Sequence, residues 1–473
     1  MNSSSPFTRR GFLSGSAIAA GAVALPSLLR SQPAPGPAPA SSAYPSGASG
    51  QPAWMRKPLA PGEPGRHYRP TVTLNGSALP FRIVEDAKIF HLVCEEVDHV
   101  FIPKTDANDE LRATCWGFNG SVHGPTIECV EGDHIRIYVT NNLPAPTSIH
   151  WHGLLVPSGM DGVGGLSQAP IPPGETFKYE FTVWQHGTYM YHSHHDEMTQ
   201  MALGMLGMFI VHPREMPSPA PDRDYTYMLS EWKIVPGTRR PDPNEMTDFN
   251  ILTFNGRAYP GTAPLLAQLG DRVRVRIGNL SAMDHHPIHI HGHAWKLIET
   301  DGGPIPEAGQ WPETTVLVPT GSTRTVEFIA DNPGDWAMHC HMTHHVMNQM
   351  GHAIPNLIGV DPGGLDKQVR TFLPGYMTMG QDGMGDMGDM GMRIPGNSVP
   401  MVGSVGPHGY ITMGGMYTNV KIRADLGDLD PAKGEDFLYG GWFENPPGTQ
   451  ALVASADDLT RDGIDPKTPA GTG

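Results

Sequence analysis

One internal repeat constrains the fold of this chain more than any other feature. The stretch GFNGSVHGPTIECVEGDHIRIYVTNNL, which starts at residue 117, is matched by TFNGRAYPGTAPLLAQLGDRVRVRIGNLS, which starts at residue 253. Each copy has an Asn-Gly turn and a Gly-Asp pair, followed by strict alternation of apolar and polar residues, which predicts β-strands. With 57 glycines and 47 prolines for turns, short alternating strands are typical of Greek-key sandwiches and barrels. We therefore predict an all-β fold used twice.

The repeat divides the chain into predicted regions. Its 473 residues suffice for two to four domains. A tract rich in Pro, Ala and Ser precedes the first copy and is expected to be a linker, and a tract rich in Met and Gly follows the second copy as a C-terminal extension. The predicted limits are 1–30 for a signal peptide, 31–67 for the linker, 68–213 for domain 1, 222–362 for domain 2 and 363–473 for the extension.

The N-terminus resembles a twin-arginine export signal. Arg9 and Arg10 precede Gly11, Phe12 and Leu13, and a weakly apolar run of small residues follows. No later stretch reaches the 18 or so apolar residues of a membrane span. The net charge of −16 argues against nucleic acid and anionic membranes as partners. We expect a periplasmic or secreted protein without a membrane span.

Four His-x-His pairs occur at repeat-equivalent positions. Because residues i and i+2 of a strand share a face, each pair projects two imidazoles to one side. Eight imidazoles without carboxylates exceed what one tetrahedral zinc can use, and they suit a cluster of copper ions. A lone pair of this kind is more often structural, but four in register predict metal ligands. The pairs are His150 with His152, His192 with His194, His289 with His291, and His339 with His341.

A second ligand set occurs only in the second copy. It combines two imidazoles, a thiolate and a thioether, which are the ligands of a blue-copper electron-transfer site with a weak axial methionine. The predicted ligands are His286, Cys340, His345 and Met350, and the corresponding residues of the first copy are Thr147, Ser193, Met198 and Leu203. Only the second copy should therefore hold a blue copper. The thiolate also lies between two ligands of the predicted cluster, which suggests a path for electrons.

The motifs HWHG, HSH, HPIHIHGH and HCHMTHHVMNQM resemble the four copper motifs of the multicopper oxidases, the laccase-like blue copper enzymes, and the resemblance covers about residues 68 to 362. It implies an oxidoreductase with cupredoxin domains and four coppers. The type 1 copper would lie on His286, Cys340, His345 and Met350. The type 2 copper would lie on His150 and His289, and the type 3 pair on His152, His192, His194, His291, His339 and His341. A reductant would supply electrons, and dioxygen would be reduced to water.

The spacing between motifs is similar to that of the two-domain, small-laccase branch. Only 91 residues separate His194 from His286, too few for an intervening cupredoxin domain. The resemblance implies a homotrimer whose trinuclear cluster lies between domain 1 of one subunit and domain 2 of its neighbour. A head-to-tail contact must close into a ring, although geometry alone permits rings of other sizes.

Proton delivery to dioxygen requires acids near the cluster. Asp161 matches a carboxylate that in this family lies near the type 2 copper and assists proton transfer, although it could instead form a turn with Gly162. Many relatives have a second acid just after the equivalent of His345, but here that residue is Val346. Asp196 or Glu197 could replace it, and the sequence does not distinguish them.

Methionines are concentrated in two places. The thioethers of the C-terminal tract could bind Cu(I), or they could belong to a surface segment in which methionine is incidental. An earlier group at near-helical spacing is expected to serve core or interface packing. The tract contains Met377, Met379, Met384, Met387, Met390, Met392, Met401, Met413 and Met416, and the earlier group contains Met198, Met201, Met205 and Met208.

Three cysteines and several histidines remain outside these sets. Cys94, Cys115 and Cys129 lie in the first domain, where export would permit one disulfide among three possible pairings. The remaining histidines beside the motifs are interpreted as supporting or structural residues. They include His195, His285, His293, His344 and His352.

Several functions share these ligands. We expect a laccase-like enzyme that oxidises phenols, amines or metal ions, with a Cu(I), Mn(II) or Fe(II) oxidase for copper tolerance as the alternative. A copper nitrite reductase would need its thiolate in the first domain, where Ser193 stands. A periplasmic copper-binding protein would bind metal without taking up oxygen.

Overall fold

The computed structural model describes residues 55–104, 110–235, 237–247, 249–346, 368, 371–372, 403–426 and 441–466. Over these residues the chain is nearly all β, with two short α-helices, α1 (Glu197–Ala202) and α5 (Ala456–Arg461). No helix in the described ranges is long and apolar enough to cross a membrane. The predicted signal peptide, the linker residues before residue 55 and most of the methionine tract lie outside these ranges.

Domain 1 consists of two sheets that enclose one apolar core. The first sheet has the order β2-β3-β6-β8, with β4 beside β3, and the second has the order β5-β10-β9-β7. The predicted alternation places Ile135, Ile137 and Val139 of β6 inside the core, where they are fully buried. The strands are β2 (Arg82–Val84), β3 (Ala87–Ile102), β4 (Leu111–Phe118), β5 (Gly124–Val130), β6 (His134–Asn141), β7 (Ile149–His150), β8 (Thr176–Thr182), β9 (Gly187–Ser193) and β10 (Leu206–His212), with the 3-10 helix η2 (Ser158–Met160).

Domain 2 repeats this plan with two further sheets. One has the order β1-β11-β14-β20-β16-β17, with β12 beside β11 and β18 beside β16, and the other has the order β13-β24-β21-β15-β19. The strands are β1 (Val72–Thr73), β11 (Arg223–Trp232), β12 (Ile251–Phe254), β13 (Leu265–Gln268), β14 (Arg272–Asn279), β15 (His286–Ile290), β16 (Trp295–Thr300), β17 (Gly303–Pro304), β18 (Trp311–Glu313), β19 (Thr315–Val318), β20 (Ser322–Ile329), β21 (Gly334–Cys340) and β24 (Tyr417–Arg423). The remaining elements are the hairpin β22 (Ser404–Gly406) and β23 (Gly409–Ile411), and the 3-10 helices η3 (Glu307–Gly309) and η4 (Thr343–Val346).

Strand pairing shows that the two domains repeat each other. In domain 1, β10 runs parallel to β5 and antiparallel to β9. In domain 2, β24 runs parallel to β13 and antiparallel to β21. The central strands β6 and β14 also have matching neighbours, each between one parallel and one antiparallel partner. The prediction of an all-β fold used twice is confirmed.

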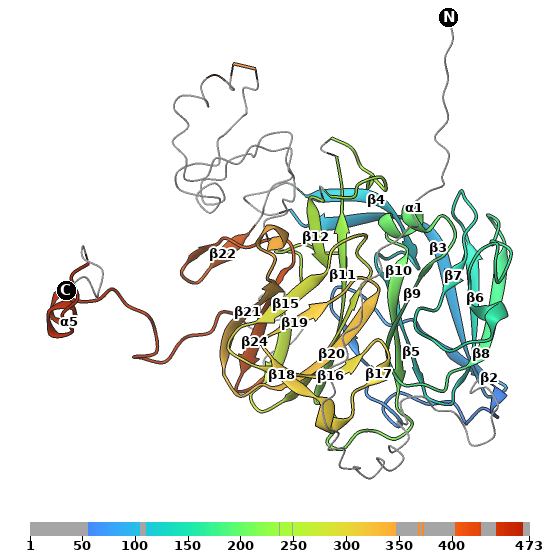
Figure 1. The fold of residues 1–473 in the computed structure, drawn as a ribbon, viewed down its shortest axis with the longest axis horizontal. Helices are drawn as coiled ribbons and strands as arrows, with labels where there is room; N and C mark the ends of the chain where they lie inside the picture. The colour runs from blue at the N-terminus through green and yellow to red at the C-terminus, as the bar shows by residue number, and fades with distance from the viewer. Residues whose placement is uncertain are drawn as a thin grey trace, which may run out of the picture. The chain divides into compact units, whose positions relative to one another are not determined.

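The last strand of domain 2 comes from the region predicted to be a C-terminal extension. β24 begins at Tyr417 and lies beside β21 (Figure 1). Its residues Val420 and Ile422 are fully buried in the core of domain 2, together with Met416 just before it. β24, which follows the predicted limit of domain 2 at residue 362, therefore belongs to a sheet of that domain. In chain order, the methionine tract falls between η4 and β24.

The four sheets form successive layers, which can be followed from right to left in Figure 1. The two sheets of domain 1 share one core, and the two sheets of domain 2 share another. Between them, Met190 and Met208 of domain 1 pack with Met228 and Leu280 of domain 2. The β5-β10-β9-β7 sheet therefore packs against the sheet that contains β14 and β20.

A second contact between the domains lies around Trp232. Phe101 of β3 packs against Trp232 with ring centroids 5.0 Å apart, and His123 stacks on it. The side chain of His99 donates to the carbonyl oxygen of Gly256, at 2.6 Å. Both histidines are buried. We call His99, His123 and their contacts in domain 2 the histidine seam.

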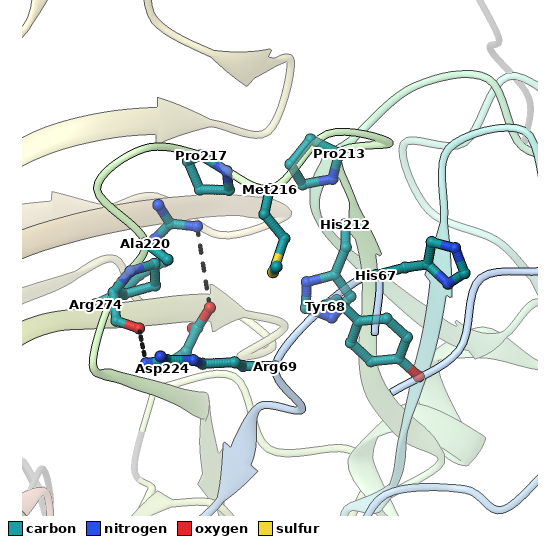
Figure 2. A pocket seen from close by; sticks show the side chains of 11 residues that line it. His67, Tyr68, Arg69, His212, Pro213, Met216, Pro217, Ala220, Asp224 and Arg274 are labelled. Carbon is teal, nitrogen blue, oxygen red and sulfur yellow. Dashed lines mark hydrogen bonds and ion pairs between the residues drawn. The ribbon is translucent and has the colours of Figure 1, made fainter. Parts of the chain in front are cut away.

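A small pocket lies where the segment before β1 meets the ends of β10 and β11. In Figure 2, Tyr68 and His212 lie together to the right of Met216 and Asp224. The ring centroids of Tyr68 and His212 are 4.3 Å apart, and His212 forms a 2.7 Å hydrogen bond with Glu128. None of the lining residues belongs to the predicted copper ligands. The pocket is part of the junction between the domains.

The three cysteines of domain 1 are buried, and so are some methionines of the earlier group. Cys94, Cys115 and Cys129 are free and buried, so none of the pairings considered above is present. In the earlier methionine group, Met205 and Met208 are buried. Helix α1 contains Met198 and Met201, but Met198 is 64% exposed. Packing is therefore the role of the buried members and not of Met198.

Candidate metal centres

Three of the four residues predicted to hold a blue copper meet inside domain 2. The Sγ of Cys340 lies 3.3 Å from Nδ1 of His345 and 3.8 Å from Nδ1 of His286. The two Nδ1 atoms are 3.1 Å apart. All three side chains are buried. The fourth, Met350, lies outside the described residues.

Strand register explains this convergence. β15 and β21 are neighbours, with Ile288 opposite Cys340, so His286 at the start of β15 lies near the end of β21. η4 then returns His345 to the same place. The Nε2 atom of His286 forms a 2.6 Å hydrogen bond with the hydroxyl of Ser281, which leaves Nδ1 to face the thiol. Such outer partners fix the orientation of a ligating imidazole.

Burial controls the charge of this set. It lowers the pKa of His345 to about 4 and lowers the pKa of His286 well below its ordinary value, so both rings are neutral, as metal ligands must be. Burial also raises the pKa of Cys340 to about 12. The thiol therefore releases a proton only when a cation replaces it, because the thiolate is the ligand form.

The first quartet of histidines gathers at the ends of β7 and β9 in domain 1. The ring of His150 is central, with centroids 5.7, 5.3 and 5.5 Å from those of His152, His192 and His194. Nδ1 of His152 and Nε2 of His192 are 3.3 Å apart. Burial lowers the pKa of His192 to about 3, which keeps it neutral. A metal ion bound between the rings could accept the lone pairs of both nitrogens, Nδ1 of His152 and Nε2 of His192.

The second quartet repeats this arrangement at the ends of β15 and β21. Here His289 is central, with ring centroids 4.9, 5.7 and 5.4 Å from those of His291, His339 and His341. The Nε2 atoms of His291 and His339 are 3.2 Å apart. Burial lowers the pKa of His339, and partial burial together with the neighbouring His289 and His341 lowers the pKa of His291. His291 and His341 are exposed at the surface of the chain.

Equivalent hydrogen bonds orient the two quartets. Four of the eight rings donate from Nδ1 to a backbone carbonyl oxygen, and this leaves Nε2 free to bind a metal. The pairs are His150 with Asp161 (2.8 Å), His192 with Ser193 (2.9 Å), His289 with Thr314 (2.8 Å) and His339 with Cys340 (2.9 Å).

The quartets lie in different layers of the fold. The first is on the β5-β10-β9-β7 sheet, and the second is on the β13-β24-β21-β15-β19 sheet. The sheet that contains β14 and β20 packs between them. Among the described residues, ring contacts join histidines within each quartet, and none joins the two quartets. Each quartet is half of the predicted cluster.

The donors fit copper better than other common metals. The set inside domain 2 offers one thiolate and two imidazoles, and the two quartets together offer eight imidazoles. Soft sulfur with imidazole suits copper, and a purely imidazole cluster lacks the carboxylates that Mg²⁺, Ca²⁺ or Mn²⁺ prefer.

Comparison with known proteins decides the family. Residues 103–216 and 236–358 match two models that are both described as multicopper oxidase, and together these ranges make up half of the chain. The chain belongs to the multicopper oxidase family. This membership confirms the resemblance seen in the motifs, implies copper as the metal, and supports the prediction of an oxidoreductase.

Other multicopper oxidases are similar over part of their length. Copper resistance protein A of Escherichia coli is 33% identical over 232 residues, which cover 39% of this chain and 38% of that protein. Laccase-1 of Cryptococcus neoformans var. grubii is 30% identical over 266 residues, which cover 50% and 42%. This chain therefore spans about two-fifths of the length of these curated relatives. The solved multicopper oxidase mgLAC superimposes with a TM-score of 0.53 and 26% identity, over 76% of this chain and 96% of that one.

Two carboxylates lie beside the first quartet of this multicopper oxidase. Asp161 follows η2, and its Oδ1 lies 3.5 Å from Nδ1 of His150. Glu197, at the start of α1, has carboxylate oxygens 3.8 Å from His192 and 3.7 Å from His194. The structure therefore brings the predicted proton donor to the predicted type 2 ligand.

Sequence reasoning did not identify an acidic pair beside His345. The Oδ2 atom of Asp284 lies 3.5 Å from Nε2 of His345, on the ring edge away from Cys340. The buried Glu231 accepts from the backbone N–H of Asp284 at 3.2 Å. Burial, with Asp284 beside it, raises the pKa of Glu231 to about 8. These residues belong to no motif, and no signal in the sequence identified them.

Proposed function

We propose that this chain is a laccase-like multicopper oxidase that couples one-electron oxidation of phenols, amines or metal ions to the reduction of dioxygen to water. His286, Cys340 and His345 would hold the type 1 copper, with the thioether of Met350 as weak axial ligand. The two quartets would hold one type 2 and two type 3 coppers. Copper would supply electron uptake at the thiolate and four-electron reduction of dioxygen at the cluster.

The observation that carries this proposal is the strand position of Cys340. Side chains of successive strand residues point to opposite faces. Cys340 therefore faces the core with His286 and His345, whereas His339 and His341 belong to the second quartet on the other face. One backbone segment thus joins the thiolate set to the cluster set, and an electron would cross only a few covalent bonds between them.

The separation of the quartets supports a homotrimer with the cluster at subunit interfaces. Each quartet has open sides, since His291 and His341 are exposed and His194 is partly exposed. The first quartet of one subunit would close on the second quartet of the next. A head-to-tail contact of this kind closes into a ring, and three-fold closure follows the small-laccase resemblance.

Subunit mixing tests this assembly directly. One variant loses the first quartet through His150→Ala and His152→Ala, and the other loses the second through His289→Ala and His291→Ala. Each variant alone should be inactive. Co-assembled subunits should regain oxygen uptake, because some interfaces then join two intact quartets. Inactive mixtures that are trimeric by light scattering would contradict clusters built between subunits.

Asp161 and Glu197 would deliver protons to dioxygen. Asp161 contacts His150, the proposed type 2 ligand, and Glu197 contacts two proposed type 3 ligands. Glu197 is thus favoured over Asp196 as the substitute for the acid that is absent at Val346. Loss of a positioned proton donor costs roughly 10²- to 10⁴-fold in rate.

The reductant would dock at the edge of His345. The carboxylate of Asp284 beside Nε2 favours donors that are cationic or that lose a proton when oxidised. Phenols, aromatic amines and Cu(I) all meet this condition. The relative named copper resistance protein A supports the cuprous alternative, and the relative named laccase supports phenols.

Oxygen uptake by copper-loaded, full-length protein tests the function. We expect uptake with a phenol, Cu(I) or Mn(II) as donor, with water as the product and no hydrogen peroxide released. Methionine-to-leucine substitution throughout residues 377–401 should lower only the cuprous rate if that tract relays copper. Copper binding without any oxygen uptake would contradict an oxidase and favour a periplasmic copper-binding protein, and the N-terminal twin arginines would support its export.

A further inference from the structure

A loop of domain 1 presents an exposed leucine beside the first quartet. Leu166 is 84% exposed, although hydrogen bonds fix the backbone around it. The N–H groups of Leu166 and Ser167 donate to the carbonyl oxygen of Val163 at 3.1 and 3.0 Å, and the N–H of Val163 donates to Oγ of Ser167 at 2.8 Å. We call residues 163–168 the knob loop. A single exposed leucine is ordinary on a protein surface, so its significance depends on its neighbours.

The backbone of the knob loop is fixed to the first quartet. The N–H of Gly164 donates to the carbonyl oxygen of His194 at 3.3 Å. Gly162, two residues earlier, approaches β7 so closely that a Cβ atom there would lie 1.7 Å from the carbonyl oxygen of Ile149, the residue before His150. Its φ of 87° is also one that glycine adopts readily. The knob loop therefore has a fixed place relative to the metal ligands of domain 1.

Helix α1 adds a second exposed apolar side chain at the first quartet. Met198 is 64% exposed. Its neighbour Glu197 contacts His192 and His194, so the start of α1 lies at the quartet. Neither Leu166 nor Met198 belongs to the apolar core of domain 1. Exposed apolar side chains that gather at one place mark an interaction site more than scattered ones do.

The second quartet lies beside a hollow in the surface of domain 2. The hollow has a volume of about 480 Å³ and includes His289 and His291 themselves, with Ala294 and Trp336 among the residues that line it. The Nε2 atom of His293, which also lines it, is buried and has no hydrogen-bond partner in the part of the chain that the structure describes. Buried polar atoms are usually paired, so this atom favours a surface that a partner covers.

An exposed apolar side chain accompanies the second quartet as well. Thr315 of β19 lies opposite His289 of β15, so the two side chains share a face. Leu317, two residues along β19, points to that same face and is 51% exposed. Both quartets are therefore open to the outside, and both have exposed apolar side chains beside them.

We propose that Leu166 of one subunit inserts into the hollow beside the second quartet of the next subunit. The inference rests on the proposed function, because it names the contact that would bring the two halves of the cluster together. The knob loop cannot fill the hollow of its own chain, since the sheet that contains β14 and β20 packs between the two quartets. The occupant of the hollow is therefore a second copy of this chain.

The closeness of both features to the ligands gives the contact its register. Leu166 lies two residues from Gly164, which is bonded to His194, and Ala294 lies three residues from His291. When the quartets of two subunits close on shared copper ions, these neighbours come together as well. Burial of Leu166 then adds apolar stabilisation to that of the metal bonds.

Cross-linking between subunits tests the contact. Leu166→Cys combined with Ala294→Cys places thiols on the knob loop and in the hollow, and both positions are exposed in the single chain. The native cysteines are buried and should not react. A short bis-maleimide should join the double variant into covalent dimers and trimers on a denaturing gel, whereas each single variant should stay monomeric there. A double variant that is trimeric by light scattering but does not cross-link would overturn the proposal.

A charge at the tip of the knob loop tests its contribution to assembly. Leu166→Asp should raise the protein concentration for half-assembly at least about tenfold, because an apolar side chain is no longer buried. Cluster copper should be lost on dilution, whereas the thiolate colour should stay, since Cys340 and its two histidines lie inside domain 2. Ala294→Arg in the same chain should restore part of the assembly through an ion pair with the introduced carboxylate.

Leu452→Asp is the matched control, because Leu452 is 81% exposed but lies outside the knob loop and the hollow. It should assemble as the parent protein does. A Leu166→Asp variant that assembles and keeps all its copper at the same dilution as the parent would overturn the proposal. A parent protein that is monomeric yet holds a complete cluster would overturn the proposed subunit interfaces instead. The two failures are therefore distinguishable.

Discussion

The two domains place different chemistry at one position of one fold. In domain 2 the position holds His286, Cys340 and His345. In domain 1 the hydroxyl of Thr147 donates to Gln200 at 2.6 Å, and the Gln200 amide donates to the carbonyl oxygen of Pro146 at 2.8 Å. Buried polar groups are stable when they are hydrogen-bonded. In domain 1 the side chains at this position therefore hydrogen-bond within the protein, whereas domain 2 offers two imidazoles and a thiol that could bind a metal.

The domains also differ in how the chain reaches the last strand. Domain 1 passes from β9 through α1 directly into β10, so its last strand begins at Leu206. Domain 2 passes from β21 through η4 and then needs the long methionine-containing segment before β24 begins at Tyr417. The strand pairing is nevertheless the same. The last strand therefore pairs in the same way in both domains, although very different lengths of chain precede it.

Among the changes considered, removal of β24 should have the largest effect, because it destabilises domain 2 and leaves domain 1 intact. A chain that ends at residue 402 loses three fully buried apolar side chains, those of Met416, Val420 and Ile422. At roughly 1.5–3 kcal/mol each, this amounts to about 5–9 kcal/mol, which is comparable with the stability of a whole domain. We expect domain 2 to unfold, as measured by circular dichroism and by limited proteolysis.

The matched control for this truncation ends at residue 445. It keeps β24 and the contact in which the N–H of Phe443 donates to Asp335 at 2.7 Å. This chain should fold and bind copper as the full-length protein does. A folded, blue chain that ends at residue 402 would show that β24 is dispensable.

Cys340→Ser should abolish activity and leave the fold intact. Serine cannot supply the thiolate, so the visible colour of the copper–thiolate bond and the oxygen uptake should both be lost. The quartets should keep their copper, because their hydrogen bonds do not use Cys340 Sγ. Metal analysis and absorption spectroscopy measure the two effects separately.

Cys129→Ser is the control in domain 1, where the thiol of this β5 residue is equally buried but belongs to the apolar core. It should remain blue and active. Loss of colour in this variant with retention in Cys340→Ser would reverse the roles assigned to the two domains.

The sequence predicted the features that are set within a single strand, but not the contacts between residues that are far apart in the chain. The repeat and the alternation of Ile135, Ile137 and Val139 identified the sheets, because period-two burial is a property of each strand alone. The His-x-His pairs identified both quartets for the same reason. The contacts of Asp284 with His345, and of Met416 with Cys340, depend on tertiary register. No local pattern encodes such register.

Acid should weaken the histidine seam, where the two domains meet. Burial lowers the pKa of His99 to about 4 and that of His123 to about 3, from an ordinary value of 6.5. Between the lowered pKa of each histidine and its ordinary value of 6.5, the folded state therefore binds fewer protons than the unfolded state. The contribution of each neutral histidine to the free energy of unfolding is fully present above about pH 6.5. It is lost as the pH falls toward 4, by up to about 1.4 kcal/mol per pH unit for each histidine.

Urea denaturation of metal-free protein at several pH values measures the slope of the free energy of unfolding against pH. His99→Gln combined with His123→Gln should flatten it, whereas His91→Gln, at an exposed position on β3 in domain 1, should not. Equal slopes in all three proteins would show that other groups, among them the quartets, account for the acid sensitivity.

Ser193→Cys should have the smallest effect of all, although it places a thiol at the position in domain 1 that corresponds to Cys340. Two imidazoles are still missing, because Thr147 is engaged with Gln200, and Met198, at the position that corresponds to His345, is 64% exposed and cannot face the thiol. A thiolate without nitrogen partners does not form a blue site. The absorption spectrum and copper content should equal those of the parent protein. A second blue band would mean that the thiol alone specifies the site and that the closed hydrogen bonds of domain 1 are no barrier to it.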